Sequence, residues 1–438
     1  MSGVPLFNTP YLNDYLAMVE DTESPRIFHI WSAIFAMSSA LGRRCWLPFG
    51  TMDIFPNHYI VLVGTPGTRK STAANQGKRI LRQSTGVRFA PRDTGGQRQG
   101  LVLALKGGDD NSKEFVGAME LGAKENSISS LTQFEDISNV AEDEEQQFID
   151  VADKHHIAIV ASEFSRLIGQ NNHSMLDFLG ELYDGEDVDY LTLKSNIQVK
   201  NPLLNLLACT TPISINNALP PQVSGQGFLS RIMLVYGARK YKAVPRPMPP
   251  DLDRVAKVKE TLNNAYYQIA GGFEETTESR AYSEELYHYN LDINDSRFGY
   301  YNERRYTHLI KLSMCLAAAR GDRVIVKDDY QEAHRILRAT ERGMPDALGE
   351  FGLNPQAMLK QEILEQLRAN QGPLTFSQVI AMFHRDAKSS EIAEVLNDLI
   401  RVGQVKMNQL SSGEKVMSAV YTKKSTEDEM MTLLAEGR

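Results

Sequence analysis

The chain has 438 residues, of which 42% are hydrophobic and 23% charged, and its formal net charge is −8. These values are ordinary for a globular protein, and no run approaches the roughly 18 apolar residues that a membrane helix needs. Cys45, Cys209 and Cys315 are isolated and form no CxxC pattern. Their spacing argues against a zinc site or a disulfide framework and predicts a reducing, cytoplasmic location.

The negative charge is concentrated in one stretch. Residues 107–156 carry 13 acidic residues against three lysines, so the rest of the chain is nearly neutral. It contains local basic clusters at Arg43-Arg44, 78–82, 88–98 and Arg304-Arg305. Most clusters of this kind are solvated faces, so the net charge neither supports nor excludes a nucleic-acid partner.

The first 55 residues favour helices, with Pro25 opening an amphipathic helix over 26–41 and a strand and turn over 46–57. The first residues lack the basic and apolar regions of a secretory signal. Residues 58–240 then alternate helical stretches with strand-like runs. This alternation predicts an α/β fold with a mainly parallel, buried sheet, whose strands lie at 59–64, 157–162, 203–211 and 232–237.

Proline-rich residues 244–252 predict a hinge. The pattern is helical from 253 to 343, breaks near 345–355, and continues as three helices and a polar hairpin over 356–423. Three helices and a hairpin are the outline of a winged helix. We therefore expect an N-terminal helical segment (1–55), an α/β core (56–243) with an acidic insertion (107–150), a helical lid (244–350), a winged helix (356–423) and a mobile tail (424–438).

The stretch GTPGTRKS (64–71) nearly matches a phosphate-binding loop, with Arg69 where the pattern has its last glycine. Such a loop binds phosphate because successive backbone N–H groups and a helix N-terminus converge on the anion. Lys70 would neutralise phosphate charge, and the Ser71 hydroxyl would ligate Mg²⁺. A glycine-rich turn before a core helix would not explain Lys and Ser at this spacing. The predicted nucleotide-binding residues are Gly64, Thr65, Pro66, Gly67, Thr68, Arg69, Lys70, Ser71 and Thr72.

A second strand ending in an acid is expected in such an enzyme. HIAIVASE (156–163) places Glu163 at a strand end, where it would polarise the attacking water and contact Mg²⁺ through water. The neighbouring position holds Ser162, which can only hydrogen-bond where Asp would hold a metal-bound water by charge. A lone Glu at a strand end is otherwise a solvated rim residue.

Several stretches align in order with one family. The chain resembles the AAA+ motor of minichromosome maintenance replicative helicases, whose loop also replaces the last glycine. The resemblance covers about 58–340. It is carried by GTPGTRKS (64–71), GGQRQGLVLALK (95–106), ASEFSRL (161–167), TLKSNIQVK (192–200), LLACTTP (206–212), GFLSRIML (227–234) and the helical segment 302–337. Ser162 and Thr211 depart from the family's Asp and Asn, and the family's N-terminal DNA-binding domain is not found.

The resemblance implies roles for four further residues. Lys194 would face DNA from a hairpin, Thr211 would orient water, Arg231 would be an arginine finger, and Arg304 would be the lid's sensor. It also implies ATP and Mg²⁺ as cofactors, a homo-hexameric ring around single-stranded DNA, and a primase or other replisome partner. The chain is also similar to primase-associated ATPases of phages and mobile elements, and this similarity implies a phage or mobile-element origin. Lys194 as an exposed lysine and Arg231 in an interior salt bridge are the simpler alternatives.

We therefore expect an ATP-dependent DNA translocase acting as a replicative helicase. A helicase loader or initiation regulator, using ATP as a conformational switch, is the first alternative. A nucleotide-binding scaffold in phage defence or packaging is the second. The winged helix is expected to bind either DNA or a protein.

Overall fold

The computed structural model describes residues 6–90, 97–107, 154–170, 172–191, 196–219, 227–289, 292–293 and 295–349. Nearer the carboxyl end it describes 359–360, 363–364, 366–367, 370, 373–383, 387–409 and 415–419. The acidic insertion beyond Gly107 and the tail at 424–438 lie outside these residues. In the described part of the chain, no helix is both long and apolar enough to cross a membrane.

A four-stranded, all-parallel sheet organises the fold, as the alternation of strand-like and helical runs predicts. Its strands are β3 (Tyr59–Val63), β4 (His156–Ala161), β7 (Leu203–Thr210) and β8 (Ile232–Tyr236), in the order β4-β7-β3-β8. β3, β4 and β7 are buried along their whole length. A parallel bridge from Phe89 to Ala158 extends the sheet beyond β4. Because the strands are parallel, their carboxyl ends lie along one edge.

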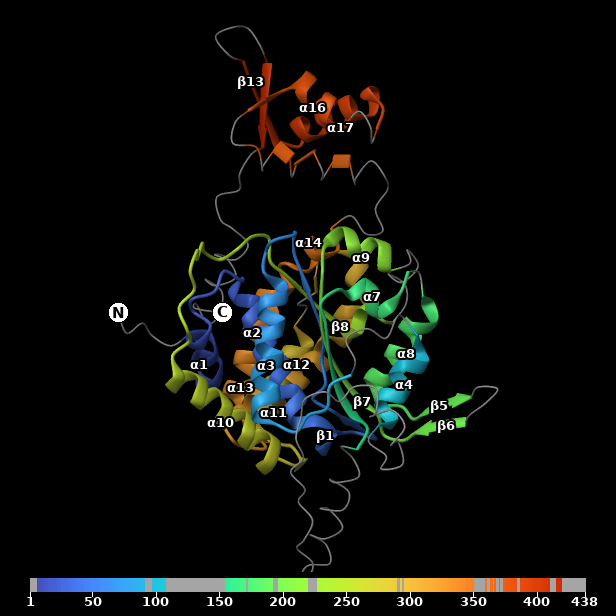
Figure 1. The fold of residues 1–438 in the computed structure, drawn as a ribbon, viewed down its shortest axis with the longest axis vertical. Helices are drawn as coiled ribbons and strands as arrows, with labels where there is room; N and C mark the ends of the chain where they lie inside the picture. Colours follow the sequence, from blue (N-terminus) through green and yellow to red (C-terminus); the bar gives the residue numbers. More distant parts are fainter. Residues whose placement is uncertain are drawn as a thin grey trace, which may run out of the picture.

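Helices cover both faces of this sheet (Figure 1). On one side, α2 (Arg26–Leu41) packs against β3, β7 and β8, and α3 (Lys70–Ser84) packs against α2, β7 and β4. On the other side lie α4 (Arg98–Lys106), α7 (Phe164–Ile168) and α8 (His173–Asp184). α9 (Pro212–Ala218) follows β7 and contacts α7.

The helix over 26–41 is confirmed, but its expected amphipathic character is wrong. Every residue of α2 except Arg26 is buried, because the helix lies between the sheet, α3 and helices from the second half of the chain. A helix that is apolar all round is a core helix. The N-terminal segment is therefore packed into the core that surrounds the sheet.

The segment after β8 is largely helical, as predicted. Its helices are α10 (Leu252–Gln268), α11 (Thr277–His288), α12 (Gly299–Ala319), α13 (Lys327–Glu341) and α14 (Met344–Leu348). The helix α1 (Pro10–Met18) packs on α10, and α12 packs on α2. One continuous apolar core runs from Phe7 to Leu348 and crosses both predicted boundaries at 55 and 244.

Short strand pairings connect these layers. β1 (Cys45–Phe49) pairs with β2 (Met52–Ile54) and with the two-residue strand β9 (Gly271–Gly272). β10 (Glu274–Glu275) pairs with β11 (Val324–Ile325), and β5 (Val188–Leu191) pairs antiparallel with β6 (Asn196–Val199). The pairings of β9, β10 and β11 were not indicated by the sequence. The described residues also include short 3-10 turns at η1 (Gly42–Arg44), η3 (Leu229–Arg231) and η4 (Ser296–Phe298).

The C-terminal residues have a core of their own. α16 (Phe376–Phe383) and α17 (Ser389–Arg401) pack with β12 (Leu374–Thr375), β13 (Val405–Gln409) and β14 (Lys415–Ala419), and the strands form an antiparallel sheet in the order β12-β14-β13. Helices followed by a hairpin agree with the predicted outline; the winged-helix assignment stays a prediction.

Candidate functional site

The loop at 64–69 begins where β3 ends and is held against its neighbours. The Gly64 N–H donates to the Thr210 carbonyl of β7 at 3.3 Å, and the Gly237 N–H beyond β8 donates to the Val63 carbonyl at 2.9 Å. A Cβ atom on Gly64 would lie 2.5 Å from the Gly237 carbonyl oxygen and 2.8 Å from Thr68 Oγ1. Only glycine fits so close an approach.

The loop turns into α3 through two left-handed residues. Gly67 has φ +88 and Arg69 has φ +63 and ψ +29, so Arg69 adopts the conformation that a glycine would adopt without strain. Thr68 is buried and closes the turn, because its N–H and Oγ1 both donate to the Thr65 carbonyl, at 3.3 and 2.9 Å. The loop therefore forms without the usual last glycine.

The beginning of α3 is open to solvent. Gly67, Ser71 and Thr72 are exposed, and Lys70 is half-buried. The first N–H groups of a helix have no partner inside it and carry partial positive charge. Nothing lies within 4 Å of the position that a Gly67 Cβ would occupy. This end of α3 therefore offers backbone donors to an incoming anion.

Lys70 is folded back onto the loop. Its ammonium donates to the carbonyls of Gly64, at 2.6 Å, and Thr65, at 3.0 Å. Partial burial lowers the pKa of Lys70, while the neighbouring Cys209 and Glu163 act in the opposite direction. The Lys70 amine is therefore a partly desolvated cation close to Glu163.

The ends of β4 and β7 meet the loop at this edge. Ala161 pairs with Ala208, which sets Glu163 level with Thr210. Glu163 Oε1 accepts from Thr210 Oγ1 at 3.5 Å and from Ser165 Oγ at 3.3 Å. Thr210 in turn lies directly opposite Val63 at the end of β3. Glu163 and Lys70 are thus brought to the same edge, with β7 between their strands.

Cys209 adds a contact from inside the sheet. Its thiol is buried and hydrogen-bonds with the Ser71 side chain, and burial raises its pKa to about 12. The group stays a neutral thiol and is no nucleophile at ordinary pH. Its position shows that the Ser71 hydroxyl faces the end of β7.

Thr211 does not reach Glu163 through a hydrogen bond; Thr210 does. Thr211 Oγ1 accepts from the Ser214 N–H at 3.1 Å and donates to Ser214 Oγ at 2.9 Å, so it caps α9. Sequence reasoning missed Thr210 because two adjacent threonines end β7. Neighbouring residues of a strand face opposite sides, so only one of the two threonines can face Glu163, and the register of β7 against β4 decides that it is Thr210.

Arg231 and Arg304 lie together, away from Lys70. Arg231 precedes β8, whose first residue pairs with Tyr59, so it lies at the opposite edge of the sheet, about 16 Å from the loop by strand rise. Asp184 binds both arginines: its Oδ2 accepts from Arg231 Nε at 3.1 Å and its Oδ1 accepts from an Arg304 guanidinium nitrogen at 2.9 Å. Burial would raise the pKa of Asp184, but the two arginines outweigh it and the pKa is lowered.

Arg305 is the interior member of the adjacent pair. Its Nε lies 2.6 Å from Glu341 Oε1, and both side chains are buried. Arg304 is therefore the arginine with access to the surface. Lys194 lies outside the described residues, although β5 and β6 on either side of it pair as the expected hairpin would.

Comparison with protein-family models finds no match, and neither does comparison with curated proteins. The interpretation of the site therefore rests on its geometry and on the motifs quoted above.

Proposed function

We propose that this chain is an ATPase of the AAA+ class, with its catalytic site at the carboxyl edge of the central sheet. The observation that carries the proposal is the convergence of three strand ends. The loop and Lys70 follow β3, Thr210 ends β7, and Glu163 follows β4. A cation, a hydroxyl and a carboxylate at a helix N-terminus are the groups that phosphoryl transfer to water requires.

Each residue has a role in this proposal. The N–H groups of Gly67 and residues 69–71 cradle the phosphates, and Lys70 leaves the carbonyls of Gly64 and Thr65 to neutralise them. The Ser71 hydroxyl would ligate Mg²⁺, and the bound ion would supply charge stabilisation to the transferred phosphoryl group. Glu163 accepts the proton of the attacking water, and Thr210 orients the carboxylate. The exposed start of α3 and its surplus of donors fit such a ligand.

The proposed larger activity is translocation on DNA by a ring, with replicative helicase action. The ordered motifs shared with minichromosome maintenance helicases support it. A second support is that Arg231 and Arg304 lie at the edge opposite Lys70, where they cannot reach their own chain's loop. In a homo-hexamer they would act on the neighbouring subunit's phosphate, which couples hydrolysis to assembly. Lys194 would contact the phosphates of a single strand.

The test is ATP hydrolysis by the purified protein with and without single-stranded DNA. We expect hydrolysis that DNA stimulates severalfold, that Lys70→Ala and Glu163→Gln abolish, and that Lys194→Ala reduces to the unstimulated rate. An exposed-lysine control, Lys257→Ala, should behave as the parent. Robust hydrolysis that Lys70→Ala leaves intact would refute the proposed site. Hydrolysis that is indifferent to DNA would refute the motor.

One observation favours a second candidate, a helicase loader or regulator that uses ATP as a switch. Ser162, where an acid would hold a metal-bound water, is exposed and carries no charge, which suits slow turnover. A loader would assemble in an ATP-dependent manner and displace no strand. Sedimentation with ATP, combined with a forked-duplex unwinding assay, separates the two functions.

A further inference from the structure

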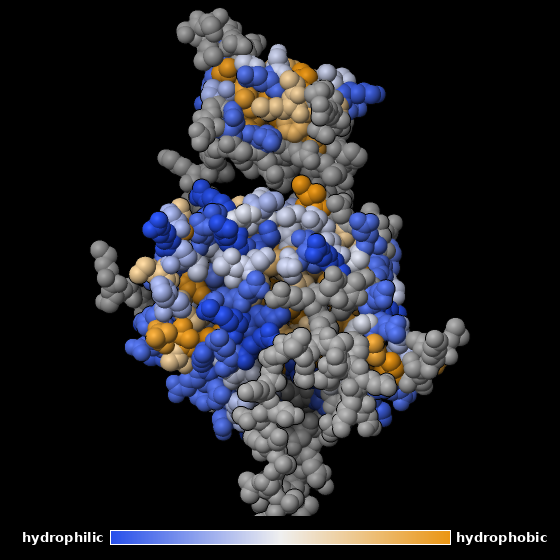
Figure 2. All heavy atoms as spheres, viewed as in Figure 1, coloured by the Kyte–Doolittle hydropathy of each residue, from blue (hydrophilic) through white to orange (hydrophobic). Residues whose placement is uncertain are grey.

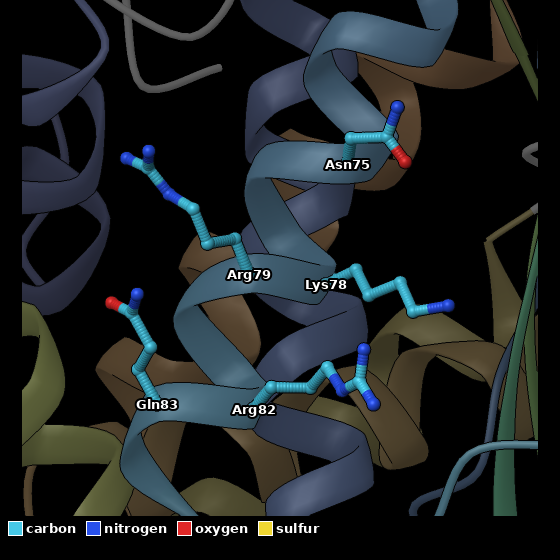
Figure 3. A pocket seen from close by; sticks show the side chains of 5 residues that line it. All are labelled: Asn75, Lys78, Arg79, Arg82 and Gln83. Carbon is cyan, nitrogen blue, oxygen red and sulfur yellow. The ribbon is translucent and has the colours of Figure 1, made fainter. Parts of the chain in front are cut away.

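The outer face of α3 carries a basic hollow that the proposed catalytic site does not use. Five side chains line it, Asn75, Lys78, Arg79, Arg82 and Gln83, around a volume of about 460 Å³. Every one of them can donate hydrogen bonds, three are cations, and none is acidic. Figure 3 shows Lys78, Arg82 and Asn75 on one side of the helix and Arg79 and Gln83 on the other.

Two of the cations are held in place by one ring. Lys78 Nζ lies 5.0 Å from the centroid of Phe89, and the Arg82 guanidinium carbon lies 5.5 Å from it. Phe89 is itself fixed where it bridges to Ala158 beside β4. Cation–π contacts of this length hold a charge without neutralising it. The charges are therefore positioned in advance for an anion, which lowers the entropy cost of binding.

The spacing of these cations costs helix stability. Arg79 and Arg82 are three residues apart, so like charges face each other on adjacent turns. Within the residues that the structure describes, neither Arg79 nor Arg82 forms an ion pair that would relieve the repulsion. A bound polyanion would relieve it.

The hollow is separate from the nucleotide loop. Helical rise places residues 78–82 about 12 to 18 Å from Lys70 along α3, beyond the reach of one bound triphosphate. Asn75, Arg79, Arg82 and Gln83 are exposed, and the face over α3 is hydrophilic in Figure 2. Small-molecule sites enclose most of their ligand. An open, basic, donor-only surface suits a chain of phosphates that passes over it.

We propose that this α3 basic hollow binds the phosphate backbone of single-stranded nucleic acid without reading its bases. Arg79 and Arg82 contact neighbouring phosphates, Lys78 adds charge from beneath, and the amides of Asn75 and Gln83 donate to phosphate oxygens. The α3 basic hollow lies outside the proposed catalytic site. The helix α3 connects the two sites, since it presents Lys70 at one end and the hollow along its outer face.

The experiment is fluorescence anisotropy of a labelled oligothymidylate with the full chain, without nucleotide, at salt concentrations from about 50 to about 200 mM. Arg79→Gln/Arg82→Gln is compared with Arg246→Gln/Lys257→Gln, which removes the same charge from exposed positions elsewhere. The first pair should weaken binding about threefold or more and flatten the salt slope by about 1 to 1.5. The control pair should bind as the parent. Equal urea midpoints would show that both folds are intact.

A second set of measurements shows whether the hollow binds a nucleic-acid backbone or a free polyphosphate. In Lys70→Ala protein, which lacks the loop's cation, inorganic tripolyphosphate should compete with the oligonucleotide only weakly. Unchanged affinity and slope in Arg79→Gln/Arg82→Gln would overturn the proposal, as would an equal loss in the control pair. Tight, saturable tripolyphosphate binding with no oligonucleotide binding would also overturn it and indicate a free-phosphate site. Because the assay uses no hydrolysis, an inactive ATPase would leave this result interpretable.

Discussion

The Arg69 side chain binds Glu23, a residue 46 positions earlier in the chain, with Nε 2.6 Å from Glu23 Oε2. Glu23 also accepts from Lys240 Nζ at 2.8 Å and from the Val244 N–H at 3.3 Å. The hydrogen bonds of Lys240, Arg69 and Val244 lower the pKa of Glu23 to about 2, so it stays ionised. The neighbouring Ser24 hydroxyl donates to the Arg69 carbonyl at 2.8 Å. The loop is thus fastened to the segment before α2 and to the one after β8.

The contacts of Arg69 with Glu23 and Ser24 explain how an arginine occupies a left-handed position. They also predict how two Arg69 variants rank in stability. Arg69→Gly removes the backbone strain together with the ion pair, whereas Arg69→Ala removes the ion pair and keeps the strain. We expect the Gly variant to exceed the Ala variant in free energy of unfolding by about 1 kcal/mol. Urea denaturation measures the difference. An Ala variant as stable as the Gly variant would show that Arg69 is unstrained.

Thr210 and Thr211 are adjacent, but we expect substitution of Thr210 to lower the rate of hydrolysis and substitution of Thr211 to lower stability. Thr210→Val removes the hydroxyl that reaches Glu163, so hydrolysis should fall about tenfold, as expected for the loss of one orienting hydrogen bond of about 1.4 kcal/mol. Thr211→Ala removes the α9 cap and should cost about 1 kcal/mol of stability, while Thr211→Ser keeps the cap. Steady-state rates and urea midpoints on the same preparations check both. A rate loss confined to Thr211→Ala would reverse the assignment.

The sequence predicted the strands of the central sheet well and their surroundings less well. Strand runs such as 59–64 are apolar throughout, and that pattern has few solutions other than a buried parallel strand. The partner of Arg69 could not be predicted, because the contact joins residues 46 positions apart through the packing of α2. Choosing Thr210 over Thr211 needed the register of β7 against β4, which local pattern does not contain. The burial of α2 could not be predicted from local pattern either, because it depends on helices far along the chain.

The two arginines bound by Asp184 predict complementation between subunits. If Arg231 acts on a neighbour's phosphate, Arg231→Ala chains retain a usable loop, and Lys70→Ala chains retain a usable arginine. Each variant alone should be inactive, and their mixture should recover hydrolysis because some interfaces combine the two intact halves. Rates measured across mixing ratios test this. A mixture as inactive as its components would restrict Arg231 to its salt bridge with Asp184.

A buried lysine in α12 carries a pH dependence that is separate from the catalytic edge. Lys311 Nζ lies 2.7 Å from Asn57 Oδ1 and 3.9 Å from the centroid of the Tyr183 ring. Burial lowers the pKa of Lys311 from 10.5 to about 7; Asp184 opposes the shift, and Arg304 adds to it. Between these two values the unfolded chain holds a proton that the folded chain does not. The contribution of Lys311 to the free energy of unfolding should therefore be largest above pH 10.5 and should fall as the pH falls toward 7.

Lys311→Met isolates this effect, since it keeps the length of the side chain and removes the titrating amine. The parent's free energy of unfolding should rise between pH 7 and 9 by up to about 1.4 kcal/mol per pH unit, and the Met variant should lack that rise. The Asn57 oxygens lose a donor in the variant, but that cost is the same at each pH, so the slope is the readout. Urea titrations at intervals across this window, with Lys257→Met as the exposed control, measure it. A Met variant that keeps the parent's slope would mean that Lys311 stays charged in the folded protein, held by Asn57 and the Tyr183 ring.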